Sequence, residues 1–177
     1  MRPIVWTVLV WLCAATAAVA ADQVLTFTGL QPVKIGMSVA EAEAALGYKL
    51  KPLDTSDLVS TEACWLTERA DGTQHALTYM VRNGKISRID VWEEDGHPAD
   101  IRSRAGLRIG ATESAVMDAH GKALEISGHP HLGEEGRYLL LPASDKRHGL
   151  LFEIVRGKVV NLRSGELESI RLTETCA

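Results

Sequence analysis

The chain has 177 residues, of which 46% are hydrophobic and 24% charged, and its formal net charge is −4. A chain of this length forms one ordinary domain or two small units that share a core. Its acidic balance disfavours binding to nucleic-acid phosphates or to an anionic membrane surface.

The first 21 residues have the pattern of a secretory signal peptide. Arg2 precedes an apolar run over residues 4–12, and the segment ends in small residues at 18–21. This order is typical of a cleaved export signal. A membrane anchor is the alternative, but the run relies on weakly apolar alanines, and the bulky residues before Cys13 disfavour lipidation. We therefore expect a periplasmic or secreted protein without stable membrane insertion after cleavage.

Two cysteines, Cys64 and Cys176, remain once this leader is removed. In an oxidising compartment, an even pair in a small exported protein favours one disulfide. A disulfide that closes so long a loop contributes about 4 kcal/mol in the chain-entropy model. Two buried free thiols are the alternative. Nothing near Cys64 supplies an activating arrangement for catalytic thiol chemistry.

The first half of the mature chain predicts a short strand at 22–27, a capped helix and then a series of strands. Ser38 and Glu41 have the spacing of a capping box, in which each side chain accepts a free backbone amide. Apolar positions after Ser38 share one helical face, and Gly47 ends the helix. Strands are expected at 63–67, 74–81 and 85–92. Asn83-Gly84, between the last two strands, is typical of a two-residue hairpin turn.

That turn also fixes an expected register for the hairpin. The register places five residues of mixed aromatic and charged character on one face: His75, Tyr79, Arg88, Asp90 and Trp92. Such a mixture on a sheet face that no helix covers is typical of a protein-binding surface. The alternative is that this face is the covered one, with its apolar members in the core. In either case we take Trp92 as the anchor.

A second copy of this pattern begins 74 residues later. Residues 109–121 repeat the order of residues 35–47, which is an apolar residue and a glycine, a capping hydroxyl residue, a short helix and a closing glycine. Self-similarity at a fixed spacing is typical of repeat architectures. We expect a signal peptide over 1–21, a first helix and hairpin repeat over 22–95 and a second over 96–177, with a charged linker at 93–103.

The second half predicts a loop at 128–136, a strand at 137–141, and a hairpin of strands 150–155 and 158–163 across Arg156-Gly157. Residues 168–176 alternate and predict a final strand tied back through Cys176. The fold class is therefore α+β. Two tandem helix-plus-antiparallel-sheet repeats form a two-layer sandwich with short helices on one sheet face.

The segment Ile-Gly-Met-Ser-Val-Ala-Glu-Ala-Glu-Ala-Ala-Leu-Gly at 35–47 resembles the opening of a module that two groups of proteins share. These are the outer-membrane assembly lipoproteins of the SmpA/OmlA type and the secreted β-lactamase inhibitor proteins. In that superfamily a helix pair packs on a short antiparallel sheet, and the inhibitor proteins carry two modules in tandem. The resemblance covers residues 30–92 and 105–163, departs at Ala111 and Ala115, and implies this fold and a protein partner.

The sequence contains no constellation typical of an enzyme. A Gly-rich phosphate loop, a nucleophile elbow and a His-Glu metalloprotease helix are all absent. The carboxylate pairs at 93–94 and 134–135 lie in hydrophilic segments, where adjacent charges are usually solvated. We therefore expect a non-enzymatic, exported protein-binding module without a cofactor, either inhibitor-like or an envelope accessory protein. Its partner is another protein in the cell envelope or outside the cell.

Two other functions stay open. His129-Pro130-His131, together with His148, offers imidazole ligands to a metal ion, although no cysteine or paired carboxylate lies beside them. The alternative function is therefore a periplasmic small-molecule or metal sensor that uses these loop histidines. A hydrolase is the remaining possibility.

Overall fold

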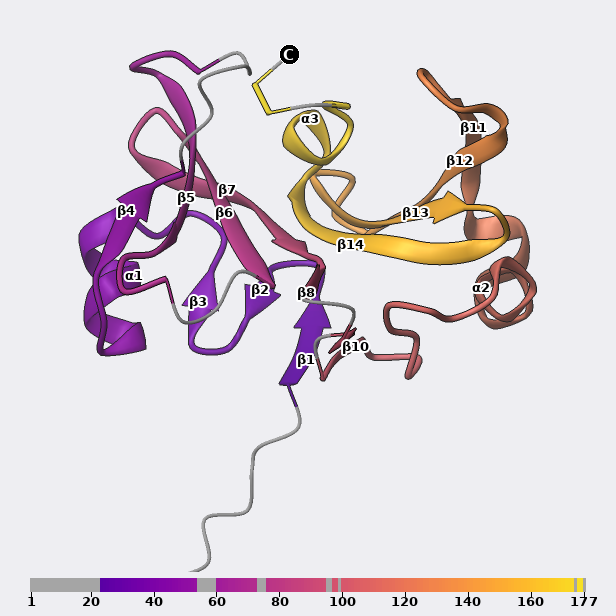
Figure 1. Cartoon of the computed structure of the whole chain (residues 1–177), viewed down its shortest axis with the longest axis horizontal. Helices are drawn as coiled ribbons and strands as arrows, with labels where there is room; N and C mark the ends of the chain where they lie inside the picture. Colours follow the sequence, from indigo (N-terminus) through magenta and orange to yellow (C-terminus); the bar gives the residue numbers. More distant parts are fainter. Residues whose placement is uncertain are drawn as a thin grey trace, which may run out of the picture.

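The computed structural model describes residues 23–53, 60–72, 76–94, 97–98, 100–173 and 175–176 (Figure 1). The predicted signal peptide lies outside these residues. The helices are short, and within the described ranges none is long and apolar enough to cross a membrane. They are α1 (Val39–Leu46), α2 (Glu113–His120) and α3 (Leu167–Ile170), with a 3₁₀ turn at Gly121–Ala123.

Most of the described chain belongs to strands. The largest set is β4 (Leu50–Pro52), β5 (Cys64–Arg69), β6 (Leu77–Arg82), β7 (Lys85–Val91), β11 (Glu125–His129), β12 (Gly133–Pro142), β13 (His148–Val155) and β14 (Lys158–Glu166). The others are β1 (Gln23–Thr26), β2 (Gly29–Leu30), β3 (Val33–Lys34), β8 (Glu93–Glu94), β9 (His97–Pro98) and β10 (Ile101–Ser103).

These strands form one large sheet and two small ones. The large sheet has eight strands in the order β11-β12-β13-β14-β7-β6-β5-β4. A four-stranded sheet has the order β10-β1-β2-β3, and β8 pairs with β9. Since β10 pairs in parallel with β1, the segment predicted to be a charged linker contributes strands instead. The sheet-rich α+β class with few short helices is confirmed.

The two longer helices begin and end at the predicted residues. Ser38 Oγ accepts the amide of Glu41 at 3.3 Å, and the Glu41 carboxylate accepts the amide of Ser38 at 2.7 Å. At the start of α2, Thr112 Oγ1 accepts the amide of Ala115 at 3.2 Å. Each helix ends at a glycine with positive φ. A short hydroxyl side chain that accepts a free amide is what begins such helices.

The segment before each helix is hydrogen-bonded to a hairpin in the same way. The amide of Gly36 donates to the Ile86 carbonyl at 2.8 Å, and the amide of Gly110 donates to the Val159 carbonyl at 2.8 Å. The amides of Ile86 and Val159 donate back to the residue after each glycine, at 2.7 and 2.9 Å. The chain therefore anchors both helices to the large sheet through corresponding bonds.

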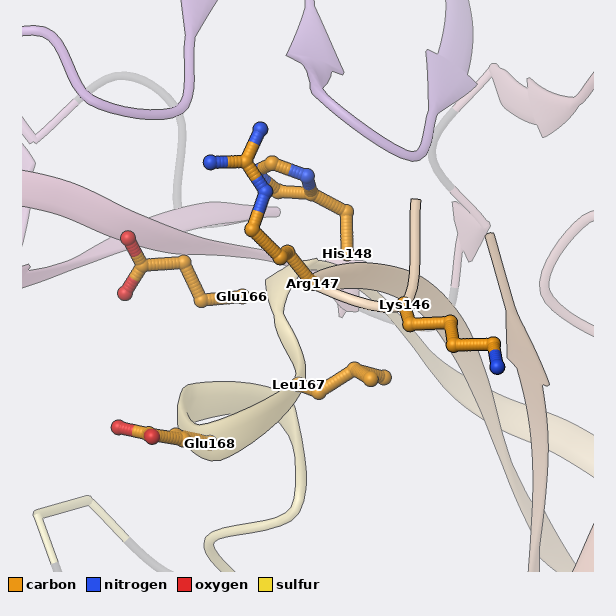
Figure 2. Close-up of a pocket in the computed structure, with 6 residues that line it drawn as sticks. All are labelled: Lys146, Arg147, His148, Glu166, Leu167 and Glu168. Atoms are coloured by element: carbon orange, nitrogen blue, oxygen red, sulfur yellow. The ribbon is translucent and has the colours of Figure 1, made fainter. Parts of the chain in front are cut away.

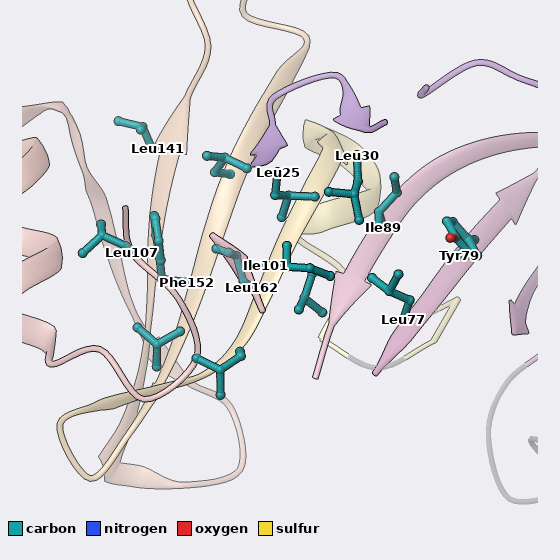
Figure 3. Close-up of a cluster of buried hydrophobic side chains, with 14 of the residues drawn as sticks. Leu25, Leu30, Leu77, Tyr79, Ile89, Ile101, Leu107, Leu141, Phe152 and Leu162 are labelled. Atoms are coloured by element: carbon teal, nitrogen blue, oxygen red, sulfur yellow. The ribbon is translucent and has the colours of Figure 1, made fainter. Parts of the chain in front are cut away.

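One face of the large sheet lines the main hydrophobic core. Ala42 of α1 and Val116 of α2 belong to this core, together with residues of the four-stranded sheet. Figure 3 draws part of the cluster, including Leu25, Leu77 and Phe152. The third helix, α3, lies on the opposite face of the sheet in Figure 1, where Ile170 packs in a second cluster.

Two further sequence predictions are wrong. Residues 128–136, predicted as a loop, include the end of β11 and the start of β12. β11 is an edge strand exposed on both faces, so it lacks the alternation that marks a half-buried strand. Residues 168–176, predicted as a strand, begin in α3, where Leu167 and Ile170 have helical spacing and pack on the sheet.

Candidate functional site

The β6–β7 hairpin carries the predicted protein-binding residues, but its register differs from the prediction. Ser87 is an extra residue on β7, so Tyr79 lies opposite Ile89 and not opposite Arg88. One extra residue moves every later side chain of its strand to the other face. The two-residue turn alone does not reveal this bulge, and the predicted register is wrong beyond it.

The predicted surface residues consequently lie in different places. Tyr79 is in the main core, while Arg88 and Asp90 lie on the opposite face, and all three are at most 2% exposed. Trp92 is 36% exposed, and its indole Nε1 donates to a threonine hydroxyl at 3.3 Å. His75 lies outside the described residues. The common exposed face that the sequence predicts is therefore not formed by Tyr79, Arg88 and Asp90.

Arg88 and Asp90 instead belong to a buried ionic network between the two halves of the large sheet. Asp90 accepts from Arg88 Nε at 2.8 Å and lies 3.3 Å from Arg163 Nε. Arg163 also donates to Glu153 at 2.8 Å and to Asn161 Oδ1 at 2.8 Å. Burial lowers the pKa of Arg88, whereas Asp90 beside it favours the charged guanidinium. The two arginines balance the two carboxylates.

The C-terminal segment covers this network. Nη1 of Arg88 donates to a backbone carbonyl of α3 at 3.0 Å, and Nη1 of Arg163 donates to the Leu172 carbonyl at 2.8 Å. Beyond Leu172, Cys176 is joined to Cys64 of β5, with the two Cα atoms 5.9 Å apart. The predicted cysteine pairing is present, and it ties the covering segment to the sheet.

The histidines considered as metal ligands have other partners. Nε2 of His129 lies 3.4 Å from Glu153 of the network, and Nδ1 of His148 lies 2.6 Å from Asp145. The His131 ring lies 6.0 Å from that of His129. Across the described ranges, no group of three His, Cys, Asp or Glu residues is placed to hold a metal ion.

His148 also lines a polar pocket of about 320 Å³ at one end of β13 and β14 (Figure 2). The pocket carries charges of both signs, and the residues that line it are Lys146, Arg147, His148, Glu166, Leu167 and Glu168. Hydrogen bonds, first of all the one from His148, hold the pKa of Asp145 well below its usual range. None of the lining residues carries a hydroxyl or thiol that nucleophilic catalysis would use.

The free edge of the large sheet carries exposed apolar side chains. β11 is the last strand of the sheet and pairs with β12 on one side only. Ile126 in β11 is 53% exposed, and Leu132 in the turn that follows is 38% exposed. With Trp92, these are the large hydrophobic residues that stand exposed in the described part of the chain. Sequence reasoning missed this edge because it assigned residues 128–136 to a loop and predicted no strand before them.

A hollow of about 400 Å³ lies beside β11. Its apolar lining consists of Ile126, Pro130, Tyr138, Leu140 and Leu151. Arg171 at this hollow forms an ion pair with Glu125, with 2.6 Å between Nη2 and Oε2. An edge strand with free backbone groups and an apolar hollow beside it can accept an extended segment of another chain.

Comparison with known proteins gives no match, because no family model, no curated protein and no solved structure matches the chain.

Proposed function

We propose that this protein is a non-enzymatic, exported protein-binding module that holds an extended segment of another protein along the free edge of β11. The observation that carries the proposal is the exposed apolar edge formed by Ile126 and Leu132. Natural edge strands are usually protected by charged residues, prolines or a covering element. Before the register shift at Gly128, β11 carries one charged residue, Glu125, and this residue is paired with Arg171.

The hollow beside β11 defines what the bound segment must look like. A strand that pairs with β11 directs alternate side chains to the same face, so one of them enters the hollow. Its walls include Ile126, Leu140 and Leu151, which favours an apolar side chain such as Leu, Met or Phe at that position. Since the protein is acidic overall, the rest of the segment is expected to be neutral or basic.

Trp92 remains a second candidate contact. It is the one residue of the originally predicted surface that is described and exposed. Exposed tryptophans are enriched among the residues that dominate binding energy at protein interfaces. The two candidate surfaces can therefore be told apart, because a substitution in β11 and a substitution of Trp92 should not both abolish partner binding.

The test is a pull-down from envelope extract with the mature protein and three variants. Ile126→Lys places a charge on the β11 edge, Trp92→Ala truncates the second candidate, and Ala44→Lys adds the same charge to an exposed site on α1. We expect a partner that the Ala44→Lys and Trp92→Ala proteins retain and that Ile126→Lys loses at least tenfold, which is about 1.4 kcal/mol.

Hydrogen exchange of the recovered complex completes this test. Pairing with a partner strand should slow exchange at those amides of residues 125–128 that point away from β12, because they become hydrogen-bonded to the partner. If a folded Ile126→Lys protein recovers the same partner as the unmodified protein, the β11 edge is not the binding surface. Loss of the partner with Trp92→Ala alone would move the binding surface to Trp92.

The tandem modules and export belong to the same proposal. The matching bounds of α1 and α2 and the corresponding bonds of Gly36 and Gly110 support two copies of one module. The leader pattern at residues 1–21 and the Cys64–Cys176 pair support an oxidising compartment. The mass of the exported protein tests cleavage after residue 21.

A further inference from the structure

A third cavity, of about 380 Å³, lies on the core side of the large sheet between β1 and the strands of the second half. Its apolar walls include Leu25 and Phe27 on one side and Leu141 and Leu150 on the other. In Figure 3, Leu141 lies at one end of the core cluster, and Leu25 lies between it and Leu30. This volume falls within the range of small-molecule sites, and such sites are mostly apolar with few polar groups.

One polar atom in this cavity is buried without a partner. Nε2 of His120, at the end of α2, is inaccessible to solvent and has no hydrogen-bond partner among the described residues. The ring packs against Phe152, with 5.8 Å between the centroids. A buried polar group without a partner is unfavourable, so a bound molecule that supplies a partner to Nε2 is stabilised by this contact.

An ordered water is a weaker candidate for that partner. A buried water usually needs about three polar groups, and each of the other two hydroxyls of the cavity already takes part in one hydrogen bond within the protein. Thr26 Oγ1 donates to a backbone carbonyl at 2.8 Å, and Ser103 Oγ accepts a backbone amide at 3.3 Å. Apart from Arg104, the remaining walls are apolar. A molecule with an apolar body and one polar group fits these walls better.

Arg104 supplies a positive charge at this cavity. It is exposed, and we find no ion-pair partner for it in the described part of the chain. Burial lowers the pKa of His120, so the imidazole is neutral at pH 7 and Nε2–H can serve as a hydrogen-bond donor. A neutral donor and an unpaired guanidinium that line the same cavity favour an anionic acceptor.

We propose that this cavity binds a small amphiphilic carboxylate of the medium-chain fatty acid class. The apolar chain lies between β1 and β12–β13, and the carboxylate pairs with Arg104 and accepts a hydrogen bond from His120. The site is separate from the β11 edge and does not depend on the proposed partner binding.

Calorimetric titration of the delipidated, disulfide-intact protein tests the proposal with three ligands of equal chain length. Decanoate, decanol and decyltrimethylammonium are added below their micelle concentrations. We expect one decanoate to bind per chain. Decanol should bind roughly tenfold more weakly because it cannot form the ion pair, and decyltrimethylammonium should bind more weakly still because its charge is reversed.

Three variants separate this site from unspecific apolar binding. Arg104→Gln should weaken decanoate about tenfold and leave decanol unchanged. Ala105→Trp places a large ring at an exposed position that lines the cavity and should abolish binding of both ligands. Ala44→Trp, on the exposed face of α1, is the matched control and should bind normally.

The opposite results would overturn the proposal. One is the absence of heat with decanoate at millimolar concentration when the protein is folded. Another is equal binding of decanoate and decyltrimethylammonium, or binding that Ala105→Trp does not change.

Discussion

The most highly charged part of the interior is held together by four side chains. Arg88, Asp90 and Arg163 are at most 3% exposed, and Glu153 is 9% exposed. Transferring charges from water to this environment costs several kcal/mol for each ion, and their mutual attraction repays this only when all remaining donors are satisfied. The backbone carbonyl of Leu172 accepts one such donor from Arg163. The network therefore depends on each member.

Removal of Arg163 alone should be strongly destabilising. Arg163→Met leaves the carboxylate of Glu153 buried without its arginine and removes one of the two arginines of Asp90, so we expect the free energy of unfolding to fall by about 3–5 kcal/mol. The matched control is Arg156→Met, which breaks an exposed ion pair with Glu135 and should cost less than about 1 kcal/mol. Urea unfolding followed by circular dichroism measures both. Equal losses in the two variants would contradict the structural role of the network.

At the scale of elements, β14 passes close to the backbone of β7 at Gly165. This residue lies opposite Arg88 and next to the bulge at Ser87. A Cβ at Gly165 would overlap the Ser87 carbonyl oxygen and lie 2.8 Å from the Arg88 Cα atom, and φ is +154°. The strand pair that joins the two halves of the sheet therefore requires glycine at this position.

Substitution of this glycine, compared with a second one, should separate the cost of a strained φ from the cost of steric overlap with a neighbouring strand. Gly165→Ala places a Cβ at a strained φ and also makes it overlap β7. We expect the free energy of unfolding to fall by about 3 kcal/mol or more. Gly157→Ala, in the last hairpin, has φ +75° but open space around its Cβ and should cost about 1 kcal/mol. Thermal and urea unfolding compare the two. If Gly157→Ala is as destabilising as Gly165→Ala, the close approach does not decide the stability of this strand pair.

The local elements could be predicted from the sequence because local interactions determine them. Ser38 and Thr112 mark the start of α1 and α2, since a hydroxyl side chain must accept the first free amides. Asn83 and Arg156 have φ of 50° and 49° before a glycine, as a two-residue hairpin turn requires. The cysteine pairing could be predicted because two cysteines, Cys64 and Cys176, lie outside the predicted leader.

The candidate sites depend on long-range contacts and could not be predicted in this way. Serine is not a residue type that marks a bulge, so the bulge at Ser87 could not be foreseen and the predicted β6–β7 register is wrong beyond it. Arg88 and Asp90 alternate along β7 and share a face, but their partner Arg163 comes from a strand far along the chain. The β11 edge gave no signal, because exposure on both faces removes alternation. The unpaired nitrogen of His120 is visible only once the surrounding core is built.

At the scale of the whole molecule, the C-terminal segment connects the two halves. It accepts hydrogen bonds from Arg88 of the first half and from Arg163 of the second, and its end is tied to β5 through Cys64–Cys176. The two cysteines are 112 residues apart in the sequence. The disulfide therefore acts on the unfolded chain by closing a long loop and on the folded chain by holding the segment over the network.

These two actions of the disulfide can be measured separately in a Cys64→Ser, Cys176→Ser protein. Loss of the cross-link should lower the free energy of unfolding by about 2–4 kcal/mol, because the unfolded chain regains conformational freedom. Hydrogen exchange of the native state reports the second action. We expect faster exchange at residues 169–172, because the segment can leave the sheet. Exchange in α1, which lies well apart from α3 in Figure 1, should change little. A loss of stability with unaltered exchange at 169–172 would restrict the disulfide to the unfolded chain. Unchanged stability and exchange would contradict both actions, and the carbonyl contacts with Arg88 and Arg163 would then suffice to hold the segment in place.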